Sequence, residues 1–305
     1  IVGAGPFGLS LAAKARSAGM DHLIVGRTME FWQDHMPRGM LLRSACDWHL
    51  DANGQHTIEQ FLATRGQLPA DVEPLSLAFY LEYVDWFRRQ SQIEVQPAQV
   101  SRLDQFNGSG SGYRATLADG GTITARRVVL ALGFREFKHV PAELAALIPA
   151  GRLSHTCDLV RFEQLARKRC LIVGGRQSAF EWAALLREQG AAEVHVCHRH
   201  DTPRFEPSDW SWVTEMMTAI VERPGWYRKL SDDERSDINR RFWEEGRLKL
   251  EPWLKPRFDH PNVRIWPRNE IAGCRELETD SLRIELASGD ALEVDHVILA
   301  TGYQV

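Results

Sequence analysis

The chain has 305 residues, of which 44% are hydrophobic and 26% are charged, and its formal net charge is −4. This composition is typical of a soluble globular protein long enough for about two domains. The small negative charge gives no electrostatic reason to expect a nucleic acid or an anionic membrane as partner, and the apolar runs are too short to span a bilayer. The five cysteines form no C-x-x-C pair, which favours a reducing compartment, most simply the cytoplasm.

The chain begins Ile1-Val2-Gly3-Ala4-Gly5-Pro6-Phe7-Gly8, which matches the pattern G-x-G-x-x-G. The surrounding sequence predicts the end of a buried strand, a tight turn, a helix over residues 9–17 and a second strand over residues 22–25. In this setting the first glycine makes the turn, the second lets the backbone approach a pyrophosphate, and the third lets helix and strand pack closely. The helix N-terminus then favours phosphate. We therefore expect a dinucleotide site here.

One expected feature of such a site is missing. In the common form of this fold an Asp or Glu ends the second strand and binds the adenosine ribose. Gly26 occupies that position, and Arg27 and Glu30 are the nearby candidates to replace the acid. Trp32 and Met40 follow as candidates for a wall of the cofactor site, although packing in the core would explain them equally well.

The rest of the first half alternates between helical and extended patterns. Residues 77–89 have the apolar spacing of an amphipathic helix, and residues 93–95 are predicted to form a short strand. A hairpin connection at residues 108–112 and the Asp119-Gly120 turn then delimit strands of a meander. Residues 127–133 are predicted to return as another buried strand.

The second half repeats this organisation. Residues 170–179 again predict strand, turn and helix start, and strand 194–197 follows the helix. Gly3 and Gly133 are 130 positions apart, and Gly174 and Gly302 are 128 positions apart. Two units of nearly equal length are more specific than one motif. The alternative is one working site and one degenerate relic, because Arg176 stands where the second glycine is expected.

Residues 206–257 match none of the motifs described above, and they carry tryptophans among charged helical patterns. The sequence Ser231-Asp-Asp-Glu234 is a capping signal that predicts a helix over residues 231–243. Two interpretations are open, a lid over a substrate site or a helical embellishment whose tryptophans fill a local core, and we favour the second. The tryptophans are Trp210, Trp212, Trp226, Trp243 and Trp253.

Taken together, these motifs resemble the two-dinucleotide-binding-domain flavoproteins and, within them, the class B flavin monooxygenases of the lysine/ornithine N-monooxygenase type. Residues 3–8 resemble the FAD fingerprint, and residues 174–179 with Glu181 resemble the NADPH fingerprint Gly-Gly-Gly-Gln-Ser-Ala. Residues 39–42 resemble the Gly-Met-Leu segment beside the flavin. Residues 297–303 resemble the Ala-Thr-Gly-Tyr signature that links the domains.

The resemblance implies an α/β fold with two Rossmann-like dinucleotide-binding domains, each with a β-meander, plus a helical Trp-rich insertion. The expected FAD-binding domain covers residues 1–140, completed by about 296–305 and a further C-terminal segment. The expected NAD(P)H-binding domain covers residues 141–295, with the insertion at about 206–257.

The resemblance also implies cofactor contacts. Arg176 would bind a phosphate or face solvent, and an arginine after the second strand could accept the 2′-phosphate of NADPH. His155 is expected to be a hydrogen-bonded structural histidine. The residues expected to bind FAD are Gly3, Gly5, Pro6, Phe7, Gly8, Arg27, Trp32, Met40, Leu42, Arg43, Val100, Gly133 and Thr301. Those expected to bind NADPH or NADH are Gly174, Gly175, Arg176, Gln177, Ser178, Glu181, Arg199 and Arg204.

The reaction implied is FAD-dependent monooxygenation that uses NAD(P)H and O2 through a C4a-(hydro)peroxyflavin to hydroxylate a small substrate. The loop Arg43-Ser-Ala-Cys-Asp-Trp-His49 differs from the amino-acid-binding version, so both an amine and a heterocycle such as urate stay open as substrates. Arg43, Asp47 and His49 are the candidates for a catalytic role, none of them certain, and no metal is expected. The alternatives are a flavoprotein reductase or oxidase with another acceptor and a nucleotide-binding flavoprotein without turnover. The oligomeric state is not predicted.

Overall fold

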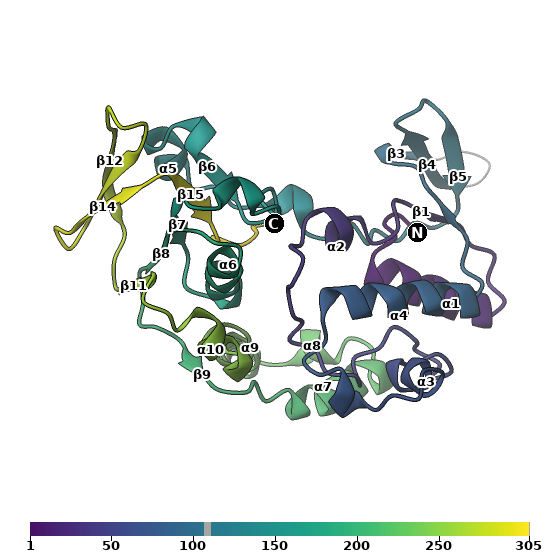
Figure 1. The fold of residues 1–305 in the computed structure, drawn as a ribbon. Helices are drawn as coiled ribbons and strands as arrows, with labels where there is room; N and C mark the ends of the chain where they lie inside the picture. Colours follow the sequence, from purple (N-terminus) through teal and green to yellow (C-terminus); the bar gives the residue numbers. More distant parts are fainter. Residues whose placement is uncertain (107–110, 305) are drawn as a thin grey trace. The chain divides into compact units, whose positions relative to one another are not determined.

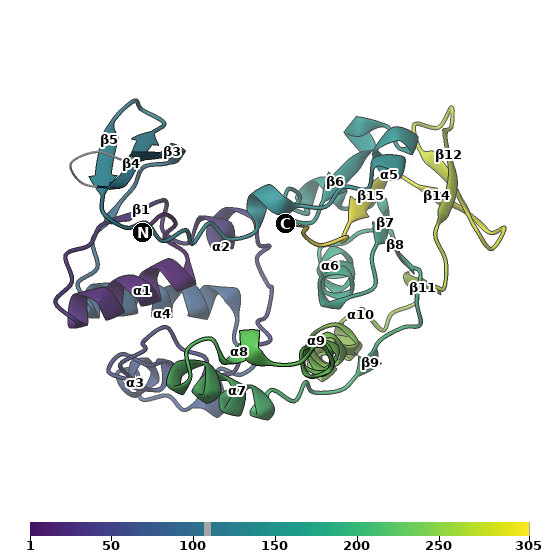
Figure 2. The ribbon, with the colours of Figure 1, turned by 180° about the vertical axis from the view of Figure 1, so that it is seen from behind.

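The computed structural model describes residues 1–106 and 111–304, which form two compact units (Figures 1 and 2). Unit 1 is Ile1–Phe137 and unit 2 is Lys138–Gln304. Both combine helices with parallel and antiparallel strands, so the predicted α/β class is confirmed. Most of the expected hairpin connection at residues 108–112 lies outside the described residues.

Unit 1 starts with the predicted strand–turn–helix. Helix α1 (Pro6–Ser17) leads to strand β1 (Ile24–Val25), which pairs in parallel with β2 (Val95–Gln96). Val2 bridges both Val25 and Leu130 in parallel fashion. The buried face of α1 consists of small and apolar side chains such as Leu9 and Ala12, and this lets the helix lie close to the strands.

The predicted buried strand over residues 127–133 is wrong. Only Leu130 is bridged, to Val2, and the side chains of Val129, Leu130 and Leu132 are 47%, 57% and 57% exposed. The apolar run resembles a buried strand in composition. Its backbone pairing in the described structure, however, is limited to bonds with Val2, whose N–H donates to Val129 and whose carbonyl accepts from Ala131.

The helical part of unit 1 supplies most of its core. The predicted helix is confirmed as α4 (Leu77–Gln90), which starts where the Ser76 hydroxyl accepts a hydrogen bond from the Phe79 N–H. Tyr83 and Phe87 of α4 are fully buried against Leu62. The shorter helices are α2 (Glu30–Asp34), α3 (Ile58–Ala63) and the 3-10 turns η1 (Pro69–Asp71) and η2 (Arg135–Phe137).

The first meander is also present. Strands β3 (Val100–Phe106), β4 (Gly112–Leu117) and β5 (Thr122–Ala125) form an antiparallel sheet in that order. The Asp119-Gly120 turn joins the second pair, and the Asp119 carboxylate accepts from the Gly121 N–H.

Unit 2 is built on a five-stranded parallel sheet in the order β11-β8-β7-β15-β6. Its central strands are almost continuously apolar and buried, as expected when both faces of a parallel sheet are covered. Helix α6 (Gln177–Glu188) packs on β7 and β8. The strands are β6 (Leu153–His155), β7 (Arg169–Val173), β8 (Glu193–His198), β11 (Val263–Pro267) and β15 (His296–Leu299).

Strand β15 differs from the expectation that residues 296–305 would complete the first domain. It pairs with β7 on one side and β6 on the other, and the chain up to Gln304 clusters with unit 2. Val297, Ile298 and Leu299 are fully buried there, because a strand between two parallel neighbours has no solvent-facing edge.

The second meander consists of β12 (Ile271–Glu276), β13 (Leu282–Leu286) and β14 (Ala291–Val294). Alternate residues of β13 and β14 are buried, so one face of this sheet joins the unit 2 core. Helix α5 (Ala142–Leu147) contributes Leu144 to the same core, and η3 (Ala150–Arg152) and η4 (Glu163–Leu165) are short turns beside β6 and β7.

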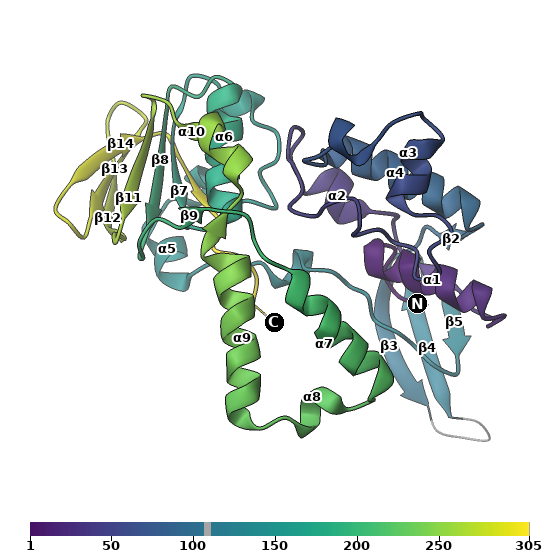
Figure 3. The same cartoon turned by 90° about the horizontal axis from the view of Figure 1, so that it is seen from below.

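Between β8 and β11 the chain forms a run of helices (Figure 3). The predicted cap is confirmed, since Ser231 and Glu234 form a capping box at the start of α9. None of the five tryptophans in this segment is buried, so they do not fill a core. The elements are β9 (Arg204–Phe205), α7 (Ser211–Glu222), α8 (Trp226–Lys229), α9 (Asp232–Arg247), β10 (Lys249–Leu250), η5 (Pro252–Leu254) and α10 (Lys255–Phe258).

No helix among the described residues is both long enough and apolar enough to cross a membrane.

Candidate dinucleotide sites

The turn before α1 is shaped by close backbone approaches. A Cβ atom added to Gly3 would lie 2.1 Å from the carbonyl oxygen of Ala131, and one added to Gly8 would lie 2.0 Å from the carbonyl oxygen of Gly3. At Gly5, by contrast, no described atom lies within 4 Å of such a Cβ. Two glycines therefore serve packing, and the third borders open space.

The N-terminus of α1 is suited to an anion. Among the described residues no side chain caps the helix, its first turn contains no acid, and Pro6 and Phe7 occupy its start. Helices α3, α4 and α9, in contrast, are capped by Thr57, Ser76 and Ser231. Phe7 is 81% exposed. The first N–H groups of α1 are thus left for a ligand such as a phosphate.

The absence of an acid at position 26 has a structural reason. A Cβ at Gly26 would lie 3.0 Å from the backbone nitrogen of Ala4, so this point of the second strand touches the glycine turn itself. Arg27 binds Glu30 at 2.9 Å and Asp34 at 2.6 Å, and Arg135 also binds Glu30 at 2.9 Å. Arg27 and Glu30, the two predicted substitutes for the acid, therefore belong to one network of ion pairs. Arg135 is a further member of this network that the sequence did not predict.

The Gly-Met-Leu segment runs beside the start of α4. Leu42 donates its N–H to the Leu75 carbonyl at 2.7 Å, and Met40 accepts from Leu77 at 3.0 Å. Leu42 is buried in the unit 1 core, and Trp32 packs on that core with its ring 4.8 Å from that of Tyr80. Met40 is half-buried. Core packing therefore accounts for Leu42 and much of Trp32.

The loop with the three catalytic candidates is organised by a residue that sequence reasoning missed. Asp51 is buried, and its carboxylate accepts the backbone N–H groups of Asn53, Gln55 and His56 at 2.8 to 3.0 Å. Burial alone would raise the pKa of Asp51, but these donors hold it below its usual value. The Asp-x-Asn-Gly turn sequence was the available signal.

The candidates themselves lie at the start of this loop. Arg43 is half-buried, Asp47 is exposed, and the Nδ1 atom of His49 accepts from the Asp51 N–H at 3.2 Å. A hydrogen bond from a neighbouring backbone N–H thus holds the His49 ring, whereas the side chain of Asp47 is exposed to solvent.

The second turn lies between β7 and α6. A Cβ at Gly174 would lie 2.5 Å from the Ala300 carbonyl oxygen, and one at Gly175 would lie 2.5 Å from Cγ of His198. Both glycines are therefore required by close packing. The N-cap residue of α6 is Arg176, and among the described residues no side chain caps this helix either. The first turn again contains no acid, so a phosphate is electrostatically compatible.

The side chain of Arg176 contacts the helical segment between β8 and β11 instead of facing solvent or the glycine turn. Its Nη1 donates to the carbonyl oxygen of Arg247 at 2.7 Å, and its guanidinium lies 5.0 Å from the ring centroid of Trp243. Burial, followed by the charge of Arg247, lowers the pKa of Arg176. Gln177 accepts from the Glu251 N–H at 3.1 Å. Two predicted nucleotide residues thus face the helical segment.

The other predicted residues of this unit divide by exposure. Ser178 is exposed at the start of α6, whereas Glu181 is fully buried. Arg199 is exposed directly after β8, and Arg204 pairs with Glu206 at 3.5 Å. Of the two arginines, only Arg199 lies beside the end of β8.

His198 is a further residue of this site. It is 3% exposed and lies against Gly175, and its Nδ1 is 2.8 Å from the His200 carbonyl, so Nδ1 carries the proton. Burial lowers its pKa, which favours the neutral ring. Its Nε2 is buried without a hydrogen-bond partner in the described part of the chain. This atom is left as an acceptor beside the turn.

Four further residues assigned by the resemblance lie outside the two glycine turns themselves. Thr301 belongs to unit 2, where its hydroxyl donates to the His139 carbonyl. His155 is buried, with Nδ1 3.1 Å from the Cys157 sulfur and Nε2 3.1 Å from the Gly302 carbonyl, as a structural histidine would be. Val100 begins β3, and Gly133 follows the bridged residue Leu130.

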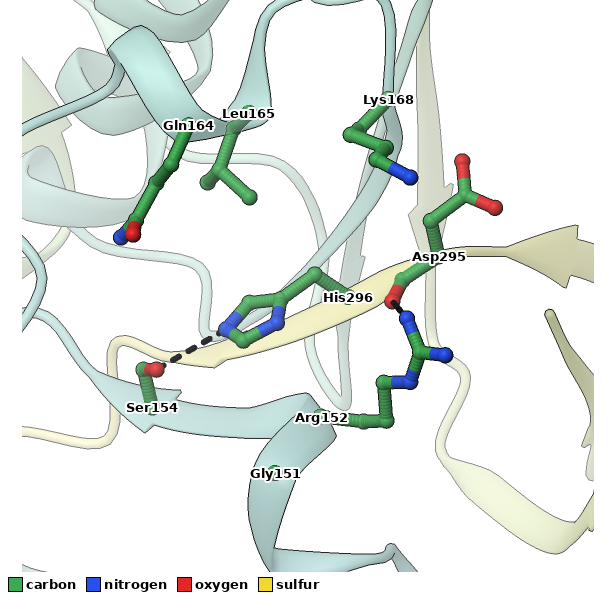
Figure 4. A pocket seen from close by; sticks show the side chains of 8 residues that line it. All are labelled: Gly151, Arg152, Ser154, Gln164, Leu165, Lys168, Asp295 and His296. Atoms are coloured by element: carbon green, nitrogen blue, oxygen red, sulfur yellow. Dashed lines mark hydrogen bonds between the residues drawn. The ribbon is translucent and has the colours of Figure 1, made fainter. Parts of the chain in front are cut away.

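A cavity of about 350 Å³ lies at the amino ends of strands in the unit 2 sheet, opposite the strand ends that lead to the α6 turn (Figure 4). It is bordered by the amino ends of β6, β7 and β15, where the Ser154 hydroxyl meets His296 Nε2 at 2.8 Å. Arg152 donates to the Asp295 carbonyl at its rim. Ligands of open α/β sheets bind at the carboxyl ends of the strands, so this cavity is separate from the α6 turn.

The chain matches the pyridine nucleotide-disulphide oxidoreductase family over residues 1–225. It belongs to that family. A curated relative, the FAD-dependent urate hydroxylase of Xanthomonas campestris, is 33% identical over 132 residues, which is 42% of this chain and 28% of that protein. The probable indole-3-pyruvate monooxygenase of Arabidopsis thaliana is 24% identical over 340 residues, covering 100% of this chain and 74% of that protein.

Among solved structures, the ornithine N-hydroxylase of Kutzneria sp. superposes with a TM-score of 0.77 at 16% identity. The match covers 99% of this chain and 80% of that chain. The predicted α/β fold with dinucleotide-binding domains is therefore confirmed by this similarity in structure. The match to the urate hydroxylase spans less than a third of that protein, so the activity of the chain is a matter for proposal.

Proposed function

We propose that the protein is a FAD-dependent monooxygenase that uses NAD(P)H and O2 to hydroxylate a small substrate. The observation that carries this proposal is the pair of strand–turn–helix units, each with a glycine turn packed against backbone and an uncapped helix N-terminus. Family membership and fold support the same class.

In unit 1 the residues present fit FAD. Gly5 borders open space at the N-terminus of α1, where a pyrophosphate would be held by backbone N–H groups. The Glu30 carboxylate, positioned by Arg27 and Arg135, is the acceptor that would take the ribose hydroxyls in place of an acid at Gly26. When bound, the flavin supplies hydride acceptance and oxygen activation, which side chains do not provide.

In unit 2 the residues present fit a nicotinamide dinucleotide. The N–H groups at the start of α6 and the Ser178 hydroxyl would hold its phosphates. The unpartnered Nε2 of His198 would accept a hydrogen bond from a ligand hydroxyl or amide, which removes the cost of a buried unsatisfied acceptor. Arg199 would bind the 2′-phosphate of NADPH.

For the substrate we propose a small anionic heterocycle of the urate kind rather than an amino acid. The loop that starts at Arg43 carries a half-buried guanidinium, which suits an anion, and the urate hydroxylase of Xanthomonas campestris is similar to part of this chain. Asp51 would keep this loop folded, so that Arg43 and His49 are presented from a fixed backbone.

A dithiol reductase is not supported, although the family takes its name from disulphide chemistry. The described structure contains no disulfide, and four of the five cysteines are buried. Burial raises the pKa of Cys46 and Cys170 to about 12 and that of Cys197 to about 11. Such thiols are poor nucleophiles at neutral pH.

Two-step rapid mixing tests the proposal. The flavin-loaded protein is reduced with NADPH or NADH without oxygen and then mixed with oxygenated buffer while absorbance is followed. A transient species before the oxidised flavin returns, with its decay accelerated by urate and its hydroxylated product recovered, is expected. Direct reoxidation with hydrogen peroxide released in full would mark a reductase or oxidase. No reduction by either nucleotide would refute the NAD(P)H site.

A further inference from the structure

Arg176 ties the second dinucleotide turn to the end of helix α9. Its guanidinium donates to the Arg247 carbonyl and lies over Trp243, and the next residue, Gln177, accepts from the Glu251 N–H. Two consecutive residues at the start of α6 thus hold the stretch of chain in which α9 ends. All of these contacts lie within unit 2.

The end of α9 is a site that attracts a cation. The last carbonyls of a helix have no intrahelical donor and form the negative end of the helix dipole. Arg247 is the last residue of α9, and the hydrogen bond from Arg176 satisfies its carbonyl at 2.7 Å. The guanidinium of Arg247 itself lies 5.6 Å from the Trp243 ring, so Trp243 interacts with both arginines.

The same guanidinium has a stronger potential partner at the other helix. Arg176 is the N-cap residue of α6, where the phosphates of a dinucleotide are expected. A phosphate can bind guanidinium through two parallel bonds in which both partners are charged, whereas the Arg247 carbonyl is a single neutral acceptor. Gln177 is also incompletely satisfied, since its Nε2 is buried without a partner among the described residues. The bond from Arg176 to the Arg247 carbonyl is therefore open to exchange for a bond to a phosphate ligand, and Gln177 Nε2 is a further donor for it.

We propose that Arg176 is a positioning residue that acts as a latch, passing from the Arg247 carbonyl to a dinucleotide phosphate and thereby releasing the end of α9. This inference rests on the proposed NAD(P)H site in unit 2. It gives a role to the arginine that stands where a glycine is expected. It also makes the helical segment responsive to whether the nucleotide is bound.

Hydrogen exchange read by mass spectrometry on the full chain tests the latch, with NADP⁺ as the probe. Saturation with NADP⁺ is expected to speed exchange severalfold at residues 244–251 of the natural protein. Arg176→Ala should exchange fast there without nucleotide and respond no further. Arg241→Ala is the matched control, because Arg241 is on the same helix and lies over Trp212 at 4.7 Å, away from the turn. It should keep the response to NADP⁺.

Calorimetric affinities separate the latch from a rigid site. Trp243→Ala loosens α9 but keeps the guanidinium, and Trp243 is 51% exposed, so the fold should tolerate the change. We expect about threefold tighter NADP⁺ binding for Trp243→Ala and about tenfold weaker binding for Arg176→Ala. Equal weakening in both variants, or binding with unchanged exchange at residues 244–251, would overturn the latch and leave the NAD(P)H site standing. Absence of NADP⁺ binding by the natural protein would refute the site and the latch together.

Discussion

A Cβ atom at Gly8 would lie 2.0 Å from the carbonyl oxygen of Gly3. Gly8→Ala therefore forces helix α1 away from the turn that it follows. We expect the free energy of unfolding to fall by about 1–3 kcal/mol, as for other overpacked sites. Urea denaturation followed by circular dichroism measures the change.

Gly5→Ala provides the contrast within the same motif. No described atom lies near a Cβ at this position, so the free energy of unfolding should change by less than about 1 kcal/mol. Flavin content after purification should nevertheless drop, because the methyl group would occupy the space where a pyrophosphate approaches the backbone. Equal loss of stability in Gly5→Ala and Gly8→Ala would contradict this division of roles.

Restoring an acid at the end of the second strand should fail. In Gly26→Asp the Cβ would lie 3.0 Å from the Ala4 nitrogen, so the substitution distorts the glycine turn. We expect lower FAD affinity than in the natural protein. Glu30→Gln should lower FAD affinity as well, with normal stability. Tighter FAD binding by Gly26→Asp in a flavin-fluorescence titration would show that the charged network around Glu30 does not serve the ribose.

Acid should unfold unit 1 partly through Asp51. Its folded-state pKa is below the ordinary value of 3.8, so the carboxylate stabilises the fold fully above about pH 4 and loses this effect as the pH falls through the lower folded value. Asp51→Ala should cost about 1–3 kcal/mol at pH 7 and less at pH 3, below the ordinary value. Asp47→Ala, at an exposed position in the same loop, is the control. Denaturant melts at both pH values compare the two variants.

Arg199 should decide between the two nicotinamide cofactors. Arg199→Ala is expected to raise the KM for NADPH about tenfold and leave that for NADH unchanged, since only NADPH carries the 2′-phosphate. Arg204→Ala should have a smaller effect, because Arg204 already pairs with Glu206. Steady-state NAD(P)H oxidation measures both. An equal rise for the two nucleotides would place Arg199 at a shared part of the ligand.

Local patterns predicted the parts of the fold that depend on local interactions. The glycine turns, the amphipathic helix that became α4 and the Ser231 capping box each follow from a few neighbouring residues. The prediction of a buried strand at residues 127–133 failed because burial depends on which strands lie alongside, and composition does not reveal which these are. The place of β15 likewise depends on pairing with strands more than a hundred residues earlier in the chain.

The site was predictable to a similar extent. Glycine spacing identified both turns, since the close approaches at Gly8 and Gly174 admit no side chain. The partners of long side chains were not predictable, because Arg176 reaches Arg247, 71 residues away, and Arg135 reaches Glu30, 105 residues away. His198 became informative only when the structure showed one ring nitrogen bonded and the other buried alone.

The contacts of Arg176 make this position non-additive with the end of α9. A glycine at this position would leave the last carbonyl of α9 without its donor and Trp243 without one of its two cations. The effects of Arg176→Gly and of changes at residues 243–251 should therefore not add, because each removes contacts that the other also removes.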